Sequence, residues 1–310
     1  MEENKPILYY FYTSYYSQKV LMLLKESGLD YDGRIVNMQG QETQSSWFLE
    51  MNPKGEVPVL KVGEKIVNGS DNIMNYLEEE KLGTKSLFPK DSSSAKKHQY
   101  WVSKLETLPI APLSYGIAYN PHLRKVQKGP IKGFILSKMR NFMDNRSSNL
   151  RIKAAENAGA LAESVLLTKA AKHDQEYHLF SSEVEYKRML KELTDMLDEI
   201  EVELISHSDK KWLIGDMFTA ADCILAVSLF RLHWIGHEDY VINEKRPQIT
   251  RYWNDLQSRE SFVESTTFPS LTLYMLKDTI KKNKELIFGY TLLPIVAGMV
   301  YFGLKTVFPQ

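Results

Sequence analysis

Cysteine is almost absent from this sequence, since Cys223 is the single one among 310 residues. A lone thiol excludes an intrachain disulfide and fits a reducing compartment. An excess of charge is absent as well, because 39 lysines and arginines balance 39 aspartates and glutamates. This balance argues against a nucleic-acid-binding protein, which normally carries a basic excess. The first residues, MEENKPILYYFY, lack a basic start before an apolar core, so we expect neither a secretory signal nor a mitochondrial presequence there.

Charge disappears altogether from one stretch near the end of the chain, 286–304. As a helix, its 19 residues would span roughly 28 Å, close to the ~30 Å hydrocarbon core of a bilayer. Tyr290 and Tyr301 lie near its two ends, where membrane-interface aromatic residues are common. The stretch therefore predicts a transmembrane tail anchor, inserted after synthesis, whose lysine asymmetry leaves the N-terminal body in the cytosol; a buried core helix is the alternative. The lysines before it are Lys281, Lys282 and Lys284, and Lys305 follows it.

Strand-like runs dominate the beginning of the chain. They are short, aromatic or β-branched, and separated by two segments with helical patterns. Their order is β-α-β followed by β-β-α, which is typical of a thioredoxin-like domain, and we place this domain at 1–88. The predicted elements are strands at 7–13 and 31–38, a helix at 18–27 capped by Ser17 and ended by Gly28, a hairpin of 57–62 and 65–67, and a helix that opens at Ser70 or Asp71 and ends at Gly83.

Helical periodicity replaces the strand signals after Phe88-Pro89. We therefore predict an all-helical domain at 89–267, with a long insertion at 147–182 that is helical, mobile or both. A juxtamembrane segment, 268–285, follows this domain and precedes the tail; it either lies at the bilayer surface or forms the last helix of the domain. Helical patterns cover 95–108, 131–146, 183–206, 219–233 and 247–258, and in 183–206 the apolar stripe consists of Met189, Leu190, Leu193, Met196, Leu197, Ile200 and Leu204.

Two local motifs are more specific than these patterns. The motif GEVPVL at 55–60 places Pro58 at the entrance of a strand, where its missing N–H does no harm. The motif FTAAD at 218–222 offers Thr219 as an N-cap with Asp222 three residues later, which is the pattern of a capping box. Together, at this separation and after this order of elements, the two motifs are a strong and specific sequence signature.

With these motifs the chain resembles the glutathione transferase superfamily over about residues 5–265, and within it the ganglioside-induced differentiation-associated protein 1 family. The resemblance rests on SYYSQKV, GEVPVL and FTAAD, on the long segment 147–182, and on the tail 286–304. It implies a glutathione transferase fold in which Pro58 is in the cis form, so that the backbone of Val57 pairs with a peptide ligand. It also implies a protein of the mitochondrial outer membrane that acts in mitochondrial dynamics and fission.

Glutathione, as ligand or co-substrate and without a metal, is the small molecule that this resemblance implies. The superfamily places a hydroxyl that stabilises the glutathione thiolate where Ser14 and Ser17 stand, so both are candidate catalytic residues. The alternative is that Ser17 caps the first helix and Ser14 is a turn residue. The usual Glu-Ser or Gln-Ser pair is replaced by Gly69-Ser70, a departure that we expect to weaken binding of the ligand's amino group. The candidate ligand-binding residues are Val57, Pro58 and Ser70.

Other reactive side chains fit structural roles better. His233 and His237 are spaced four apart, as two metal ligands on one helix face would be, but no third ligand accompanies them. Cys223 lies inside the FTAADCIL helix start, where we expect it to be buried and not nucleophilic.

Charge is segregated along the helical half of the chain. Residues 122–153 carry nine lysines and arginines against one acid, and residues 174–203 carry ten acids against three cations. Either the two segments form antiparallel helices with complementary faces, or the basic segment 122–153 binds anionic lipid or an acidic protein partner.

Three functions remain open at this point. The first is a membrane factor of mitochondrial fission with weak or no transferase activity, and the second is an active, membrane-tethered glutathione transferase. The third is a structural adaptor without a glutathione site. The mitochondrial assignment rests on the resemblance, and insertion into the peroxisomal or endoplasmic reticulum membrane is the alternative. A homodimer is expected because dimers are usual for this fold.

Overall fold

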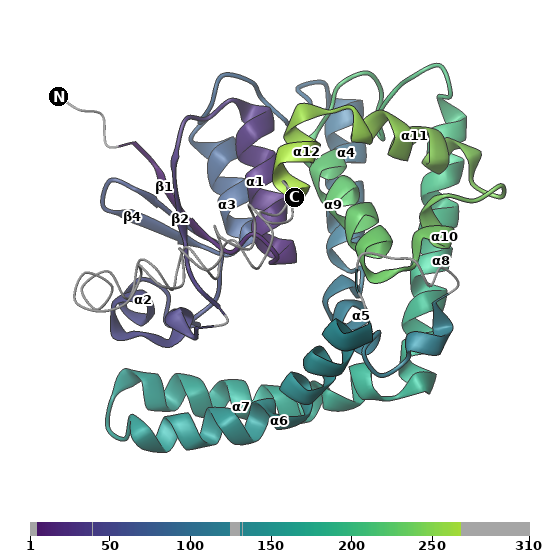
Figure 1. The fold of residues 1–310 in the computed structure, drawn as a ribbon. Coiled ribbons are helices and arrows are strands. Elements are labelled where there is room, and N and C mark those ends of the chain that lie inside the picture. The colour runs from purple at the N-terminus through teal and green to yellow at the C-terminus, as the bar shows by residue number, and fades with distance from the viewer. Residues whose placement is uncertain (1–4, 39, 125–130, 132, 268–310) are drawn as a thin grey trace, which may run out of the picture. The chain divides into compact units, whose positions relative to one another are not determined.

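The computed structural model describes residues 5–38, 40–124, 131 and 133–267, and the structural statements below concern this part of the chain. The N-terminal sheet contains β1 (Ile7–Tyr10), β2 (Asp32–Ile35), β3 (Val59–Val62) and β4 (Lys65–Asn68), in the order β2-β1-β3-β4 (Figure 1). β1 runs parallel to β2, with Ile7 opposite Asp32, and antiparallel to β3, with Leu8 opposite Leu60. β3 and β4 pair as the predicted hairpin, so the thioredoxin-like order of this domain is confirmed.

Three helices accompany the sheet: α1 (Tyr15–Ser27), α2 (Ser46–Met51) and α3 (Ser70–Glu79). α1 and α3 pack against each other and lie between the sheet and the helical domain (Figure 1). The buried side chains Leu8, Val20, Leu24, Leu60 and Ile73 fill the space between these layers. The helix α2, preceded by a 3-10 turn at Glu42–Gln44, was not predicted, because six residues are too few to show a helical period.

The start of α1 differs from the prediction. Ser14, in an extended conformation, is the N-cap, and its hydroxyl oxygen accepts a hydrogen bond from the Ser17 N–H at 3.3 Å. The prediction that Ser17 caps this helix is therefore wrong, because Tyr15 and Tyr16 already belong to its first turn. Gly28 ends the helix at φ +66°, as predicted.

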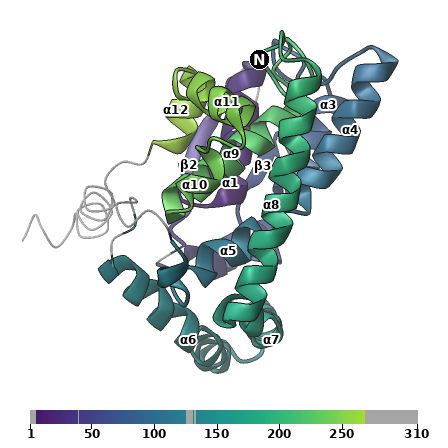
Figure 2. The same cartoon turned by 90° about the vertical axis from the view of Figure 1, so that its right-hand side faces the viewer.

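The helical domain is built around α9 (Ala220–Ile235), which packs against α1 and against most helices of its own domain (Figure 2). Nearly all of its side chains are buried, so it is a core helix of the domain. The apolar stripe predicted in 183–206 faces the interior along α8. The remaining helices are α4 (Ser92–Glu106), α5 (Ile110–Gly116), α6 (Gly133–Glu156), α7 (Leu161–Ser181), α8 (Glu183–Ser206), α10 (Glu238–Val241), α11 (Pro247–Gln257) and α12 (Glu260–Thr266), with a 3-10 turn at Pro121–Leu123.

The predicted capping box at the start of α9 is confirmed. Thr219 is the N-cap, and the Asp222 carboxylate accepts from the Thr219 N–H at 2.8 Å. Asp222 is fully buried, and it also accepts from the Leu213 N–H and the Tyr252 hydroxyl, both at 2.9 Å. The motif therefore joins α9 to the preceding loop and to α11.

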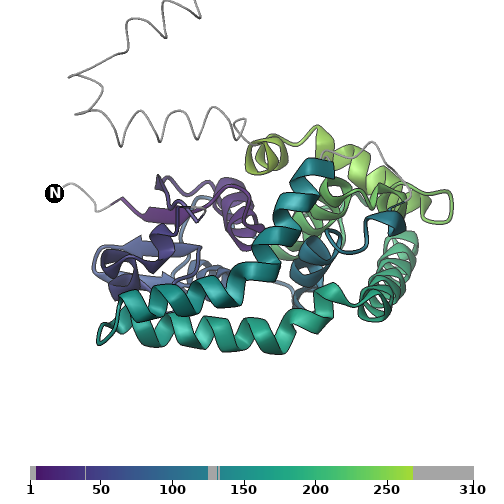
Figure 3. The ribbon, with the colours of Figure 1, turned by 60° about the horizontal axis from the view of Figure 1, so that its bottom comes forward.

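The insertion 147–182 is a helical hairpin. The helix predicted at 131–146 continues through Glu156, and α7 follows after a turn at 157–160. Figure 3 shows α6 and α7 side by side, extending from the helical domain towards the thioredoxin-like domain. Leu49 of α2 packs into the buried cluster of this hairpin, so the insertion contacts both domains. The hairpin's members of that cluster are Leu150, Ala154, Ala162, Leu166 and Ala170.

The charged side chains of the basic and acidic segments pair only in part with each other. Arg151 with Asp174, and His122 with Glu183, join the basic segment 122–153 to the acidic one. Several acids of α8 instead pair with lysines on α8 itself or on α4. Within the described residues, the acidic segment therefore pairs with α4 and with its own lysines as well as with the basic segment.

In the described part of the chain, no helix is both long enough and apolar enough to cross a membrane. The predicted juxtamembrane segment 268–285 and the predicted tail anchor 286–304 lie outside the described residues.

Candidate functional site

The loop before β3 presents an open backbone edge. The Val57-Pro58 bond is cis, as the resemblance implied. Asn52 shapes the loop, because its side-chain amide donates to the Glu56 carbonyl at 2.7 Å and its amide oxygen accepts from the Lys54 N–H at 3.1 Å. None of the hydrogen bonds found in the described residues uses the backbone of Val57, so this backbone can pair with an extended ligand.

The start of α3 lies beside this edge. The Gly69 N–H donates to the Pro58 carbonyl at 3.1 Å, which brings the helix N-terminus next to the cis-proline. Ser70 is buried at the first helical position, and its hydroxyl donates to the Asp71 carboxylate at 2.9 Å. No side chain caps this helix, so its first N–H groups and its dipole can receive a carboxylate. The structure therefore brings Val57, Pro58 and Ser70 together.

Gly69 occupies the N-cap position of α3 at φ +89°, a left-handed conformation that favours glycine. A Cβ built on it would meet nothing within 4 Å. Space for a longer side chain therefore exists, and what the site lacks is the acidic or amide group itself.

The two candidate serines differ in accessibility. Ser17 is fully buried, and its hydroxyl oxygen accepts from the Phe11 N–H at 3.3 Å. Ser14 is partly buried and uses an oxygen lone pair to cap α1, which leaves its O–H proton available for a ligand. Tyr16, one turn along, is 45% exposed, and burial of part of its ring raises the pKa of its hydroxyl, which therefore stays protonated at neutral pH. Ser14 and Tyr16 are thus the O–H donors that face outward at this helix start.

A buried lysine, which the sequence analysis missed, joins these elements. Lys19 on α1 is 1% exposed, and its Nζ lies 2.6 Å from Glu106 at the end of α4 and 3.3 Å from Asp71 at the start of α3. Its ammonium also lies 5.4 and 5.3 Å from the ring centroids of Tyr15 and Tyr16. Burial raises the pKa of Glu106, while the Lys19 charge opposes this shift. A lysine inside the apolar run QKVLMLL was the signal that it pairs in the interior.

A second buried cation holds the loop that carries Ser14. Arg231 on α9 donates to the Thr13 carbonyl at 2.8 Å and to the Gln18 side chain at 2.9 Å, and burial lowers its pKa to about 10. The Tyr15 hydroxyl and the Ser228 hydroxyl lie 2.9 Å apart. The core helix α9 therefore holds the start of α1, which carries Ser14, in place.

The histidines and the cysteine for which we predicted structural roles occupy structural positions. The His237 ring lies 2.7 Å from the buried Tyr186 hydroxyl, whereas His233 faces Glu238 at 3.1 Å, so the two histidines do not share one site. Among the described residues no cluster of three His, Cys, Asp or Glu side chains is arranged to hold a metal ion. Cys223 is buried, as predicted, and burial raises the pKa of its thiol well above the usual range.

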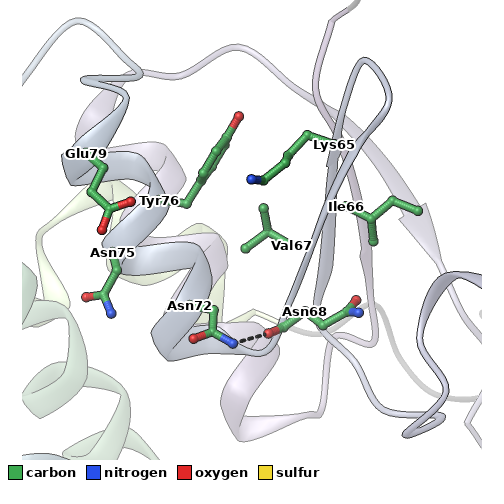
Figure 4. A pocket seen from close by; sticks show the side chains of 8 residues that line it. All are labelled: Lys65, Ile66, Val67, Asn68, Asn72, Asn75, Tyr76 and Glu79. Atoms are coloured by element: carbon green, nitrogen blue, oxygen red, sulfur yellow. Dashed lines mark hydrogen bonds between the residues drawn. The ribbon is translucent and has the colours of Figure 1, made fainter.

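A shallow depression lies elsewhere on the thioredoxin-like domain, between β4 and α3 (Figure 4). Its volume is 450 Å³, and the Asn72 side chain donates to the Asn68 carbonyl at 2.9 Å on its wall. It includes none of the candidate catalytic or ligand-binding residues, so we do not place the site there. Its lining residues are Lys65, Ile66, Val67, Asn68, Asn72, Asn75, Tyr76 and Glu79.

Comparison with known proteins gives the same assignment for both domains. Family models for the glutathione S-transferase N-terminal domain and C-terminal domain match residues 13–80 and 183–253. Glutathione transferase F7 from Populus trichocarpa has a similar fold, with a TM-score of 0.56 at 20% identity, covering 85% of this chain and 100% of that one. The beta-etherase LigF from Sphingobium sp. strain SYK-6 has a TM-score of 0.58 at 19% identity, covering 84% and 98%. The fold, with its cis-proline edge and capping box, thus defines a glutathione transferase-like protein.

Among curated proteins, human ganglioside-induced differentiation-associated protein 1-like 1 is 28% identical, with 96% of this chain and 85% of that protein aligned. Tetrachloro-p-hydroquinone reductive dehalogenase from Sphingobium chlorophenolicum is 26% identical, over 85% of this chain and 96% of that enzyme. Over nearly its whole length the chain is therefore similar to the ganglioside-induced differentiation-associated protein 1 family. Neither family model covers residues 81–182, the part of the chain that contains the α6–α7 hairpin.

Proposed function

We propose that this protein is a glutathione-binding, weakly catalytic or non-catalytic factor of the mitochondrial outer membrane that acts in mitochondrial dynamics and fission. The observation that carries the proposal is the combination of an intact ligand edge with an incomplete set of groups around it. The cis Val57-Pro58 bond and the start of α3 remain, whereas Gly69 stands where a transferase carries Glu or Gln.

Binding of glutathione is supported by the edge and by the helix. A backbone edge at Val57 suits the cysteinyl part of the peptide, and the N-terminus of α3 suits the carboxylate of its γ-glutamyl end. The amino group of that end finds less support. Asp71, the acid nearest to Ser70, already lies 3.3 Å from the Lys19 ammonium, which competes with a ligand cation.

Weak catalysis follows from the hydroxyl groups. Lowering a thiol pKa from ~8.5 by two units requires about 2.7 kcal/mol of interaction that favours the thiolate. Ser17 is buried and cannot reach a ligand, so of the two candidate serines only Ser14 can supply this stabilisation. An active, membrane-tethered transferase is the second candidate, because the Ser14 proton is free to donate.

Attachment to the membrane is supported by the sequence of the tail. The uncharged stretch 286–304 has the length of a membrane span, and three of the four lysines around it precede it. The likeness to the family suggests the mitochondrial outer membrane, with the peroxisomal and endoplasmic reticulum membranes as alternatives. Anionic lipid, a protein partner at the basic segment 122–153, and a second copy of the chain are the proposed partners.

The binding experiment uses the full chain, purified in a mild detergent. Glutathione is titrated by calorimetry, and turnover is measured with 1-chloro-2,4-dinitrobenzene as the electrophile. We expect saturable binding with little turnover, and Ser17→Ala serves as the control for Ser14→Ala. Robust turnover that Ser14→Ala abolishes and Ser17→Ala does not would support the active transferase instead. If no glutathione binds, the structural adaptor without a glutathione site is the remaining function.

Localisation tests the other half of the proposal. We expect the full chain to remain in the membrane pellet after alkaline carbonate extraction and to co-purify with mitochondria. A chain truncated after Asn283 is expected in the cytosolic fraction, and removal of the full chain from cells should change mitochondrial length. Release of the full chain by carbonate, or unchanged mitochondrial shape, would contradict the proposal.

A further inference from the structure

The α6–α7 hairpin places a lysine against the candidate site. Lys169 on α7 donates from its Nζ to the Gly55 carbonyl at 2.7 Å, two residues before Val57. The hairpin reaches this loop because its buried cluster packs on Leu49 of α2. A Cβ at Gly55 would lie 2.7 Å from the Thr43 carbonyl, and the backbone there has φ +57°, so the loop that Lys169 contacts has a defined shape.

The charge environment links Lys169 to the entrance of the site. Burial lowers the pKa of Lys169 to about 8, the Glu56 carboxylate opposes this shift, and the cations Arg146 and Lys172 add to it. Glu56 also raises the pKa of Tyr16 on α1. The Glu56 carboxylate, next to Gly55 in the chain, therefore acts on the pKa of both Lys169 and Tyr16.

Each end of the ligand edge offers a group that can bind an anion. At one end, the Gly69 N–H binds the Pro58 carbonyl, so the N-terminus of α3 lies there. At the other end, Lys169 binds the Gly55 carbonyl. An extended peptide that pairs with Val57 would run between these two ends, with an anionic group favoured at each.

We infer that Lys169 binds the C-terminal carboxylate of a short peptide whose other carboxylate lies at the start of α3. This inference rests on the proposed glutathione site and assigns its glycyl end to the hairpin. An ammonium has three N–H donors, and Gly55 takes one, so two remain for a carboxylate. The specificity for this end of the ligand then comes from the insertion that both transferase family models leave out.

The test compares two ligands on the full chain in detergent at pH 7: glutathione, and glutathione monoethyl ester, whose glycyl carboxylate is blocked. We expect wild type to bind the ester about tenfold more weakly, which corresponds to about 1.4 kcal/mol. Lys169→Gln should bind both ligands with the same, reduced affinity. Lys172→Gln, an exposed position on the same helix, should keep the wild-type ratio.

The ratio of the two affinities, and not the absolute affinity, carries the result, because Lys169→Gln also removes a contact of the hairpin. Equal binding of the two ligands by wild type would overturn the assignment while leaving the glutathione site intact. A tenfold ratio that persists in Lys169→Gln would assign the carboxylate to another cation and overturn it as well. No binding of glutathione to wild type would remove the proposed site and this inference together.

Discussion

Lys19→Met is the substitution that tests most directly how the candidate site is held together. It replaces a side chain that is 1% exposed by an apolar one of similar length, and it leaves two carboxylates without their cation. Removing one partner of a buried ion pair costs about 3–5 kcal/mol. The Asp71 side chain is 60% exposed and regains water, whereas that of Glu106 is 23% exposed and does not fully do so. We therefore expect a loss near the lower limit, about 3 kcal/mol, and a fall in melting temperature on the order of 6–12 °C.

The loss should depend on pH in a defined direction. Burial already raises the pKa of Glu106 in the folded protein, and Lys19 is the main group that opposes this shift. Without Lys19 the folded-state pKa rises further above its unfolded value. An acid with a raised folded pKa destabilises the fold as the pH rises through that pKa, because the unfolded state loses its proton first. The difference between wild type and Lys19→Met should therefore be smaller at pH 5 than at pH 8.

Thermal unfolding followed by circular dichroism, on the full chain in detergent at both pH values, measures these differences. Lys25→Met is the matched control on the same helix, because Lys25 is 31% exposed and pairs with the exposed Glu264, so its loss should stay below about 1 kcal/mol. Adding Glu106→Gln to Lys19→Met should restore part of the stability. Equal losses for the two lysines, or a difference that does not grow with pH, would refute the reasoning.

Three further predictions concern the core and the hairpin. Asp222→Asn should lower stability by about 3 kcal/mol in thermal unfolding, because the buried carboxylate accepts from Leu213, Thr219 and Tyr252, and an amide presents a donor to them; an unchanged melting temperature would contradict this. Leu166→Ala, in the hairpin cluster, should cost about 2–4 kcal/mol and speed proteolysis at 157–160, unlike the exposed Leu167→Ala. Cys223 should resist iodoacetamide in the native protein and react on unfolding, since its thiol is buried and its pKa is raised; rapid native labelling, read by mass spectrometry, would disprove this.

Local sequence signals predicted most of the thioredoxin-like domain. Strand and helix periods, with Gly28 as a helix stop, predicted the order of elements. The capping box at Thr219 and Asp222 could be predicted because all of its groups lie within four positions. The boundaries were less accurate. The first helix begins at Tyr15 and not after Ser17, because Ser14 also satisfies the rules for an N-cap, and propensity alone does not decide between two serines three residues apart.

The candidate site was predicted in its backbone and less well in its side chains. The cis-proline edge and Ser70 were expected from the resemblance to glutathione transferases, and the structure places them together through the Gly69–Pro58 hydrogen bond. Lys19 was missed because its partner Glu106 lies 87 positions away in the sequence, and no periodicity reports such a pair. Lys169 was missed for the same reason, since its acceptor at Gly55 is 114 positions away.

The sequence by itself determined the elements that depend on neighbouring residues: strands, helix stops, the capping box and the proline edge, together with the uncharged stretch 286–304. Only the tertiary structure decided which polar groups face a ligand. It buried Ser17 and left Ser14 accessible, and it set Lys19 between Glu106 and Asp71. The physical reason is that burial and ion pairing depend on which distant segments fold against each other, whereas periodicity and capping depend on hydrogen bonds a few residues long.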